Sequence, residues 1–289
     1  MERLSNVSKV GTRVEPRHDR EKLEKTLLKG RPPIPLFIRC FGKFEVSLGN
    51  NKIEDGQWNS KKAKAIFWFL VYQRGHPIHK DLLMESIWPD YDIDMVQARF
   101  YKAMSRLYRI LEPDHSSRHS SNYIRCHQGA YYLDFEQVAL LDVDEFLKKI
   151  KSGEVEEKRG NHQEAFKYYL EAERLYRGDF LEENIYEGWA VTERERLRNT
   201  YGRLATKLAR LFYEQGSFGE SMEYCWKRIK SEKYCCEAYL LLMQNYCGLG
   251  ETHEAMRIYR MYSEMLKKEL GESPSLTLAR YYQEISSKG

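Results

Sequence analysis

The sequence contains no long hydrophobic run, which excludes a chain that crosses a membrane as helices. Its longest apolar stretch, residues 65–72, is far shorter than the roughly 20 residues that span a bilayer. The first ten residues also lack the apolar segment of a signal peptide. We therefore expect a cytoplasmic protein with no membrane partner.

Cysteine is scarce, and the cysteines are not spaced as in a metal site or a redox motif. The six cysteines contain no C-x-x-C pair and have no histidine at metal-ligand spacing, so we expect no metal site and buried, reduced thiols. No Ser/His/Asp or Cys/His spacing supports catalysis, and a phosphate-binding G-x-x-x-x-G-K-[ST] loop is missing. The sequence therefore predicts neither an enzyme nor a bound cofactor.

The composition is that of a folded chain of two-domain size. It has 289 residues, of which 42% are hydrophobic and 31% are charged. The net charge is only +4, and residues 1–35 alone contain nine Lys or Arg against five Asp or Glu. A positive N-terminal half fits an anionic partner. Residues 1–35, with a short helix over 19–29 and a Pro-rich end, are interpreted as a charged tail or linker.

Residues 36–136 are expected to form the first domain. Apolar side chains occupy even positions from Ile38 to Leu48, which is strand alternation, and residues 49–51 supply a turn before a second strand over 53–58.

Helices follow this sheet. Ser60 is a suitable N-cap for a helix over 61–74 that ends at Gly75, and its long apolar run predicts the core helix of the domain. A shorter helix over 79–88 is expected to bury three side chains, Leu82, Leu83 and Ile87.

A third helix is predicted from an Asp94 cap to about residue 111, and it has two faces. One face is apolar, with side chains at three- and four-residue spacing: Val96, Phe100, Ala103, Met104, Leu107 and Leu111. The second face carries four cations at the same spacing, Arg99, Lys102, Arg106 and Arg109, and no acid within the predicted helix lies three or four residues from any of them. A solvated surface is the alternative explanation for these charges.

Two short strands, over 123–126 and 131–133, predict a β-hairpin joined across residues 127–130. Three short helices followed by a hairpin are typical of a winged helix. Its third helix fits the major groove of DNA, about 12 Å wide, and its hairpin reaches the minor groove or the backbone. The hairpin next to the cationic helix therefore favours DNA binding over a solvated surface.

Arg99 and Lys102 are the best candidates for contacts with base edges, whereas Arg106 and Arg109 are candidates for phosphates. Further phosphate contacts are expected from the hairpin and from the start of the first helix: Arg125, His127, Lys61, Lys62 and Lys64. Ordinary solvation of the lysines and a plain turn role for His127 are the alternatives. Two hairpin residues, Tyr131 and Tyr132, are expected to pack against the third helix.

Residues 137–289 have a helical pattern with few breakers. Three turns share a Gly-x-x-x-Glu-Ala/Ser signature, at Gly160, Gly216 and Gly250, and the last two lie 34 residues apart, the tetratricopeptide period. An insertion over 176–181 interrupts the strict repeat. We therefore expect an α+β winged helix-turn-helix domain followed by an all-α tetratricopeptide-like helical-repeat domain, whose concave face binds another protein. Three aromatic residues are expected in its core, Tyr176, Phe180 and Trp189.

Strings in both halves resemble a known family: FGKFEV at 41–46, SRLYRIL at 105–111, GAYYL at 129–133, LYRGDFL at 175–181 and ELGESPS at 269–275. They resemble the OmpR-type winged helix and the bacterial transcriptional activator domain, a pair found in regulators similar to the Streptomyces antibiotic regulatory proteins. The resemblance implies a nucleoid-associated activator that binds double-stranded promoter DNA, often as two copies, such as a homodimer, on direct repeats. It also implies recruitment of RNA polymerase.

A protein-interaction scaffold is the main alternative function. In that case the helical repeats would bind a partner, and the winged helix would bind any duplex weakly and with little dependence on salt. Phosphate contacts, by contrast, make DNA affinity fall steeply with salt.

Overall fold

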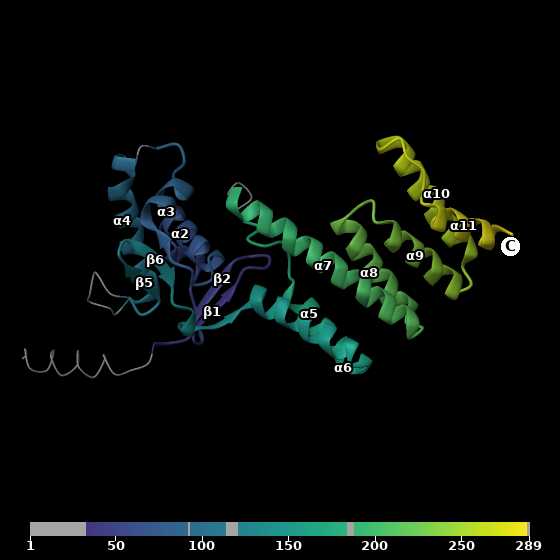
Figure 1. The fold of residues 1–289 in the computed structure, drawn as a ribbon, viewed down its shortest axis with the longest axis horizontal. Helices are drawn as coiled ribbons and strands as arrows, with labels where there is room; N and C mark the ends of the chain where they lie inside the picture. The colour runs from purple at the N-terminus through teal and green to yellow at the C-terminus, as the bar shows by residue number, and fades with distance from the viewer. Residues whose placement is uncertain (1–32, 92, 114–120, 184–187, 288–289) are drawn as a thin grey trace, which may run out of the picture. The chain divides into compact units, whose positions relative to one another are not determined.

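The computed structural model describes residues 33–91, 93–113, 121–183 and 188–287 (Figure 1). The chain is mostly helical, with two small sheets in its first half, and Pro35–Gly289 forms one compact unit. The predicted helix over 19–29 lies outside the described residues. Of the helices that are described, none has the length and apolar character that a membrane span requires.

The N-terminal sheet has the strand order β3-β2-β1-β7. Its strands are β1 (Leu36–Arg39), β2 (Glu45–Leu48), β3 (Asn51–Lys52) and β7 (Val138–Leu141). The predicted single strand from Ile38 to Leu48 is in fact a hairpin, because the chain reverses between β1 and β2, where Gly42 adopts a positive φ of 72°. The predicted strand over 53–58 was wrong as well. A 3₁₀ helix, η1 (Asp55–Gln57), stands there, and a capping box between Glu54 and Gln57 stabilises it.

The core helix is α2 (Lys61–Tyr72), and its predicted cap is confirmed. The Ser60 hydroxyl accepts a hydrogen bond from the backbone N–H of Ala63. The apolar run is buried on all sides, and the chain leaves the helix through Gly75, which has a φ of 79°.

The next helices are α3 (Lys80–Ile87) and α4 (Ile93–Leu111), and three details differ from expectation. Leu82 is 55% exposed, and Met84 is buried in its place beside the predicted pair Leu83 and Ile87. His79 precedes α3 as its N-cap instead of opening the helix. Asp94 lies inside the first turn of α4, because the helix begins at Ile93, one residue before the predicted cap.

A second sheet has the order β4-β6-β5, with strands β4 (Ile78–His79), β5 (Ile124–His127) and β6 (Ala130–Leu133). Strands β5 and β6 form the predicted hairpin, but its loop is only two residues long. Gln128 and Gly129 both have positive φ angles, 49° and 79°, as a type I′ turn requires. Strand β4 on the other side of β6 was not predicted, because two residues carry no recognisable pattern.

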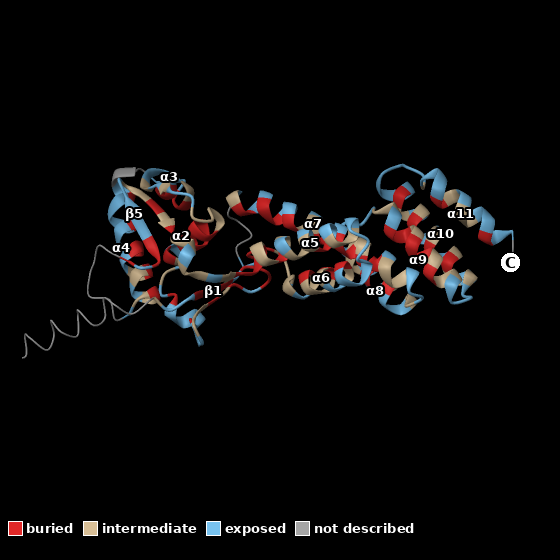
Figure 2. Cartoon of the chain, turned by 60° about the horizontal axis from the view of Figure 1, so that its bottom comes forward, coloured by how far each residue is buried: buried red, intermediate tan, exposed pale blue. Residues whose placement is uncertain are grey.

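After η2 (Phe135–Gln137) and β7, the chain is helical to its end. The helices are α5 (Asp142–Lys158), α6 (His162–Leu175), α7 (Gly188–Glu214), α8 (Phe218–Ser231), α9 (Cys236–Gly248), α10 (Thr252–Glu269) and α11 (Leu276–Ser286). The three predicted turn glycines all have positive φ. The small residues five positions later, Ala165, Ser221 and Ala255, are buried. Figure 2 shows that helices such as α7 and α9 carry both buried and exposed residues along their length.

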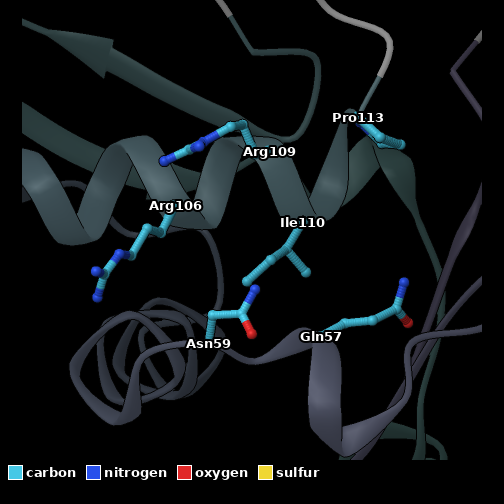
Figure 3. Close-up of a pocket in the computed structure, with 6 residues that line it drawn as sticks. All are labelled: Gln57, Asn59, Arg106, Arg109, Ile110 and Pro113. Atoms are coloured by element: carbon cyan, nitrogen blue, oxygen red, sulfur yellow. The ribbon is translucent and has the colours of Figure 1, made fainter.

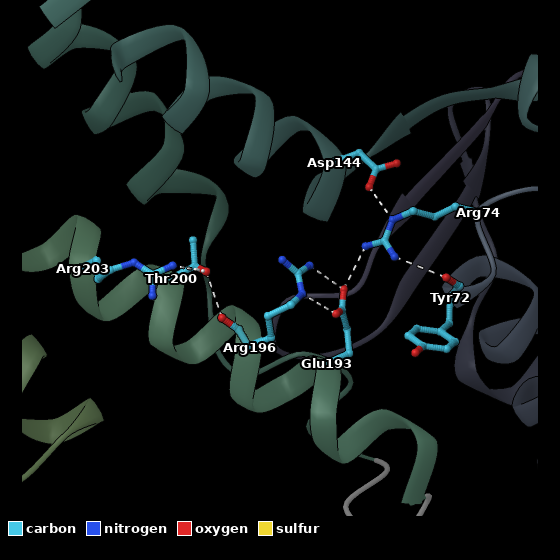
Figure 4. A network of polar contacts seen from close by, with 7 residues as sticks. All are labelled: Tyr72, Arg74, Asp144, Glu193, Arg196, Thr200 and Arg203. Atoms are coloured by element: carbon cyan, nitrogen blue, oxygen red, sulfur yellow. Dashed lines mark hydrogen bonds and ion pairs between the residues drawn. The ribbon is translucent and has the colours of Figure 1, made fainter. Parts of the chain in front are cut away.

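Polar contacts connect α5 and α7 to the end of α2 (Figure 4). The Arg74 guanidinium donates to Asp144 Oδ1 at 2.7 Å and to Glu193 Oε1 at 3.1 Å. Arg196 donates to both oxygens of Glu193, at 2.6 and 2.8 Å. Because Arg74 follows α2 while Asp144 and Glu193 belong to α5 and α7, these contacts join residues far apart in the sequence.

The insertion over 176–181 also packs against the N-terminal sheet. Phe180 forms a β-bridge with Phe41, and the backbone N–H of Gly42 donates to the carbonyl of Asp179 at 3.0 Å. Phe180 is 2% exposed, as expected of a core residue, whereas Tyr176 and Trp189 are half-buried.

The cysteines are all free thiols, but the prediction that all six are buried was wrong. Cys40 and Cys225 are buried, the former in the N-terminal core and the latter on α8. Cys126 is exposed on β5, and the remaining three are half-buried.

Candidate nucleic-acid interface

Helix α4 separates its residues into a buried and a solvent-facing side. All six predicted apolar residues are at most 4% exposed and pack within the core formed with α2 and α3: Val96, Phe100, Ala103, Met104, Leu107 and Leu111. On the other side Arg99, Lys102 and Arg109 are exposed, and Arg106 is half-exposed. The structure therefore brings the four predicted cations onto one accessible face.

This cationic face is not neutralised by acids that the structure describes. Within that part of the chain, none of the four cations forms an ion pair with a carboxylate. Glu112, three residues beyond Arg109, instead accepts from the backbone N–H and the side-chain amide of Asn122, at 2.9 and 2.8 Å. The Arg99 guanidinium lies over the Tyr91 ring, 4.6 Å from its centroid, which orients it without cancelling its charge.

The β5–β6 hairpin is attached to the buried side of α4. Tyr131 packs its ring against Phe100 at a centroid distance of 5.4 Å and is 8% exposed, so its predicted packing role is confirmed. Burial raises the pKa of the Tyr131 hydroxyl well above its usual value. Strand pairing places two side chains beside Ala130 in the same row, His127 from β5 and His79 from β4.

The two hairpin residues predicted to contact DNA differ in their hydrogen-bond partners. His127 is exposed at the end of β5. Arg125 is also exposed, but its Nε donates to Asp134 at 3.1 Å and its Nη1 donates to the carbonyl of Ser121 at 3.2 Å. The charge of Arg125 is therefore partly balanced by Asp134.

The three lysines at the start of α2 have separate environments. Lys61 is exposed. Lys62 donates to the carbonyl of Ile87 and lies over the Trp88 ring, so it connects α2 to the end of α3. Lys64 is only 13% exposed and pairs with Glu183 at 2.9 Å and with Asp55 at 3.6 Å. These contacts favour a structural role for Lys62 and Lys64.

The sequence did not indicate Gln57 and Asn59, which precede α2. They line a hollow of about 540 Å³ together with Arg106, Arg109, Ile110 and Pro113 (Figure 3). Neutral amides at the end of η1 and in the loop after it give no charge pattern, so only the folded chain brings them beside α4. Across the described ranges, no cluster of three or more His, Cys, Asp or Glu is arranged to hold a metal.

The family model of the bacterial transcriptional activator domain matches residues 141–286. Among solved structures, Mycobacterium tuberculosis EmbR, in complex with a low-affinity phosphopeptide, is similar with a TM-score of 0.72 and 17% sequence identity over 88% of this chain. This chain spans 65% of the length of that EmbR chain. At this identity the likeness shows the fold alone.

A further similar structure, the N-terminal domain of stress-induced protein-1 from C. elegans, has a TM-score of 0.35 and 12% identity, and covers 50% of this chain and 97% of that one. No curated protein matches the sequence. The family match covers half of the chain and confirms the resemblance of its second half to the bacterial transcriptional activator domain. The chain therefore belongs to the bacterial transcriptional activator domain family.

Proposed function

We propose that this protein is a sequence-specific DNA-binding transcription activator, in which α2, α3, α4 and the β5–β6 hairpin form an OmpR-type winged helix. The observation that carries the proposal is α4 itself. Its apolar side is fully buried, and its accessible side presents four cations without acidic partners among the described residues. A helix that presents unpaired cations beside a hairpin matches the geometry with which winged helices enter the major groove.

The roles of the residues follow from their position and freedom. Arg99 and Lys102, in the N-terminal half of α4, contact base edges, whereas Arg106 and Arg109 contact phosphates. On the hairpin Arg125 and His127 contact the backbone. Lys61 adds a phosphate contact from the start of α2, while Lys62 and Lys64, which are occupied by the contacts described above, contribute through the general positive charge.

The helical half, α5 to α11, is proposed to be a tetratricopeptide-like solenoid that contacts RNA polymerase or another protein. The family match supports this proposal, because it covers α5 to α11. The proposed site in the cell is the nucleoid, with two copies of the chain bound on direct repeats of the promoter.

Specific DNA binding is tested with the full chain and two duplexes, a genomic site selected by the protein and a scrambled sequence. An Arg bound to guanine through two hydrogen bonds contributes about 1–3 kcal/mol of discrimination. Arg99→Ala should therefore reduce the preference for the selected site by roughly 5- to 150-fold. Arg280→Ala on α11, which is exposed and has no ion pair with a described acid, is the matched control. If Arg99→Ala keeps the preference of the parent, the assignment of α4 is wrong.

A further inference from the structure

The hollow beside the C-terminal half of α4 is bounded by donors from two separate segments. Arg106 and Arg109 come from α4, and Gln57 and Asn59 come from the segment just before α2 (Figure 3). In the close-up, the side chains of Arg106, Ile110 and Asn59 project into the space between these segments. At about 540 Å³ the hollow is large enough for a phosphate group and its neighbouring sugar.

The hydrogen-bonding groups in this hollow are mostly donors. The Gln57 Oε1 atom accepts from the backbone N–H of Glu54 at 2.7 Å, which leaves the side-chain NH₂ of Gln57 available. Nε of Arg109 donates to the carbonyl of Ser105 at 3.3 Å and leaves the two terminal nitrogens available. Among the described residues, the side chains of Arg106 and Asn59 have no hydrogen-bond partner.

Two described acids near the hollow in sequence, Glu112 and Asp55, are engaged elsewhere. Glu112 accepts two hydrogen bonds from Asn122. Asp55 pairs with Lys43 at 2.7 Å and with Lys64 at 3.6 Å. The hollow therefore combines two guanidinium groups with two amides and no described carboxylate in its lining, which is the chemistry of an anion site.

The position of the hollow on α4 indicates which anion it binds. Arg99 and Arg106 lie seven residues apart on α4, or about 10 Å along the helix axis. The major groove is about 12 Å wide, so a helix whose N-terminal half is at the base edges brings its C-terminal half to the phosphates at the groove edge. A DNA phosphate diester is the anion that this geometry places there.

We propose that this hollow binds a phosphate of the DNA backbone at the edge of the groove that α4 enters, with Gln57 and Asn59 as direct contacts. The inference rests on the proposed function, since it needs α4 in the major groove. It adds a sequence-independent contact from a segment outside the three helices and the hairpin. This contact fixes how far α4 enters the groove.

The test uses the full chain and a random-sequence duplex, with affinity measured by fluorescence anisotropy at several salt concentrations. Asn59→Ala and Gln57→Ala should each weaken binding about three- to tenfold, because each removes one hydrogen bond. Neither variant removes a charge, so the salt dependence should stay that of the parent. Arg106→Ala should weaken binding and also reduce the slope of log K against log salt by about 0.9.

A variant that strengthens binding separates this contact from a folding defect. Asn59→Lys should raise the affinity and steepen the salt dependence, and Asn59→Asp should lower the affinity further than Asn59→Ala does. Asn50→Ala, in the exposed turn between β2 and β3, is the control and should bind like the parent. The ratio of affinities for the selected and random duplexes should be unchanged in every Asn59 and Gln57 variant.

The outcomes distinguish this inference from the proposed function. If the parent binds duplex DNA with steep salt dependence but the Asn59 and Gln57 variants all behave like Asn50→Ala, the hollow does not contact DNA. If only binding of inorganic phosphate changes in these variants, as followed by ³¹P NMR, the occupant is a free anion and the assignment to DNA is overturned. If the parent itself shows no salt-dependent DNA binding, the proposed function fails first.

Discussion

The carboxylate of Asp142 accepts the backbone N–H of Cys40 with both of its oxygens, at 2.8 and 2.9 Å, and also takes the N–H of Phe41 at 3.0 Å. Asp142 opens α5, whereas Cys40 follows β1, so one side chain joins the helical half to the N-terminal sheet. Asp142 is 2% exposed, and the two backbone donors would be buried without a partner if it were removed.

Replacing this carboxylate should destabilise the chain. In Asp142→Asn an NH₂ group replaces one of the two oxygens and faces the Cys40 N–H in either orientation of the amide, and a buried donor that loses its acceptor costs about 1–3 kcal/mol. Asp142→Ala should cost more, because both donors then lose their partner. The measurement is the free energy of unfolding in urea, with Asp90→Asn in the exposed loop after α3 as the control. Equal stability of Asp142→Ala and the control would show that the hydrogen bonds of Asp142 do not contribute to the free energy of unfolding.

Close helix packing at Gly153 predicts a second loss of stability. A Cβ at this position of α5 would lie 2.4 Å from Cε1 of Tyr169 on α6, and the Tyr169 hydroxyl is held by Glu157 and Lys207. Gly153→Ala should therefore cost about 1–3 kcal/mol by overpacking.

Gly219→Ala on α8 is the matched control for Gly153, because nothing lies within 4 Å of the added Cβ there. An alanine in a helix is favoured over glycine by about 0.5–1 kcal/mol, so this control should be neutral or slightly stabilising. The measurement is the melting temperature of the two variants under the same conditions. A destabilised control with an unaffected Gly153→Ala would refute the packing argument.

The contact network of Glu193 makes stability depend on pH. Burial opposes ionisation of this carboxyl, but hydrogen bonds and charges from Arg196 and Arg74 lower its pKa below the usual value. A carboxyl with a lowered pKa in the folded state contributes stability above its unfolded pKa of about 4.3, and the contribution is lost as the pH falls through the folded value.

Glu193→Gln should therefore be less stable than the parent near neutral pH, and the difference should shrink as the pH falls below about 4.3. Melting temperatures of both proteins between pH 3 and pH 7 provide the measurement. A difference that stays constant over this range would mean that ionisation of Glu193 does not contribute.

The ion pair between Arg125 and Asp134 predicts a gain in DNA affinity. Asp134→Asn removes the acid that balances Arg125, while an Asn can still accept the hydrogen bond from Glu136 N–H at the start of η2. The variant should bind random-sequence DNA more tightly, roughly two- to fivefold at low salt, because one surface ion pair is worth less than about 1 kcal/mol. Unchanged or weaker binding in an anisotropy titration would remove Arg125 from the proposed interface.

The features predicted from the sequence are those set by local periodicity. The buried side of α4 follows from its three- and four-residue spacing, and Ser60 was recognised as a cap because it directly precedes an apolar run. The four cations of α4 were found for the same reason. The repeat turns were located from Gly160 and its two counterparts, which all have positive φ.

What the sequence could not show depends on contacts between distant residues. Strand β7 pairs with β1, about a hundred residues earlier, and a four-residue apolar segment does not reveal its partner. Lys64 was taken for a phosphate contact by its charge, but Glu183, its partner, lies 119 residues away. Asn59 and Gln57 carry no charge, so nothing marked them until the fold placed them beside Arg106.

Whether the cationic face of α4, with the hairpin, binds the DNA backbone is tested most directly by the affinity of the full chain for a duplex as a function of salt. Four phosphate contacts, from Arg106, Arg109, Arg125 and Lys61, predict a slope of log K against log salt of about −3.6, and Arg106→Ala together with Arg109→Ala should reduce it to about −1.8. A flat salt dependence, or a slope that the double variant leaves unchanged, would contradict the claim.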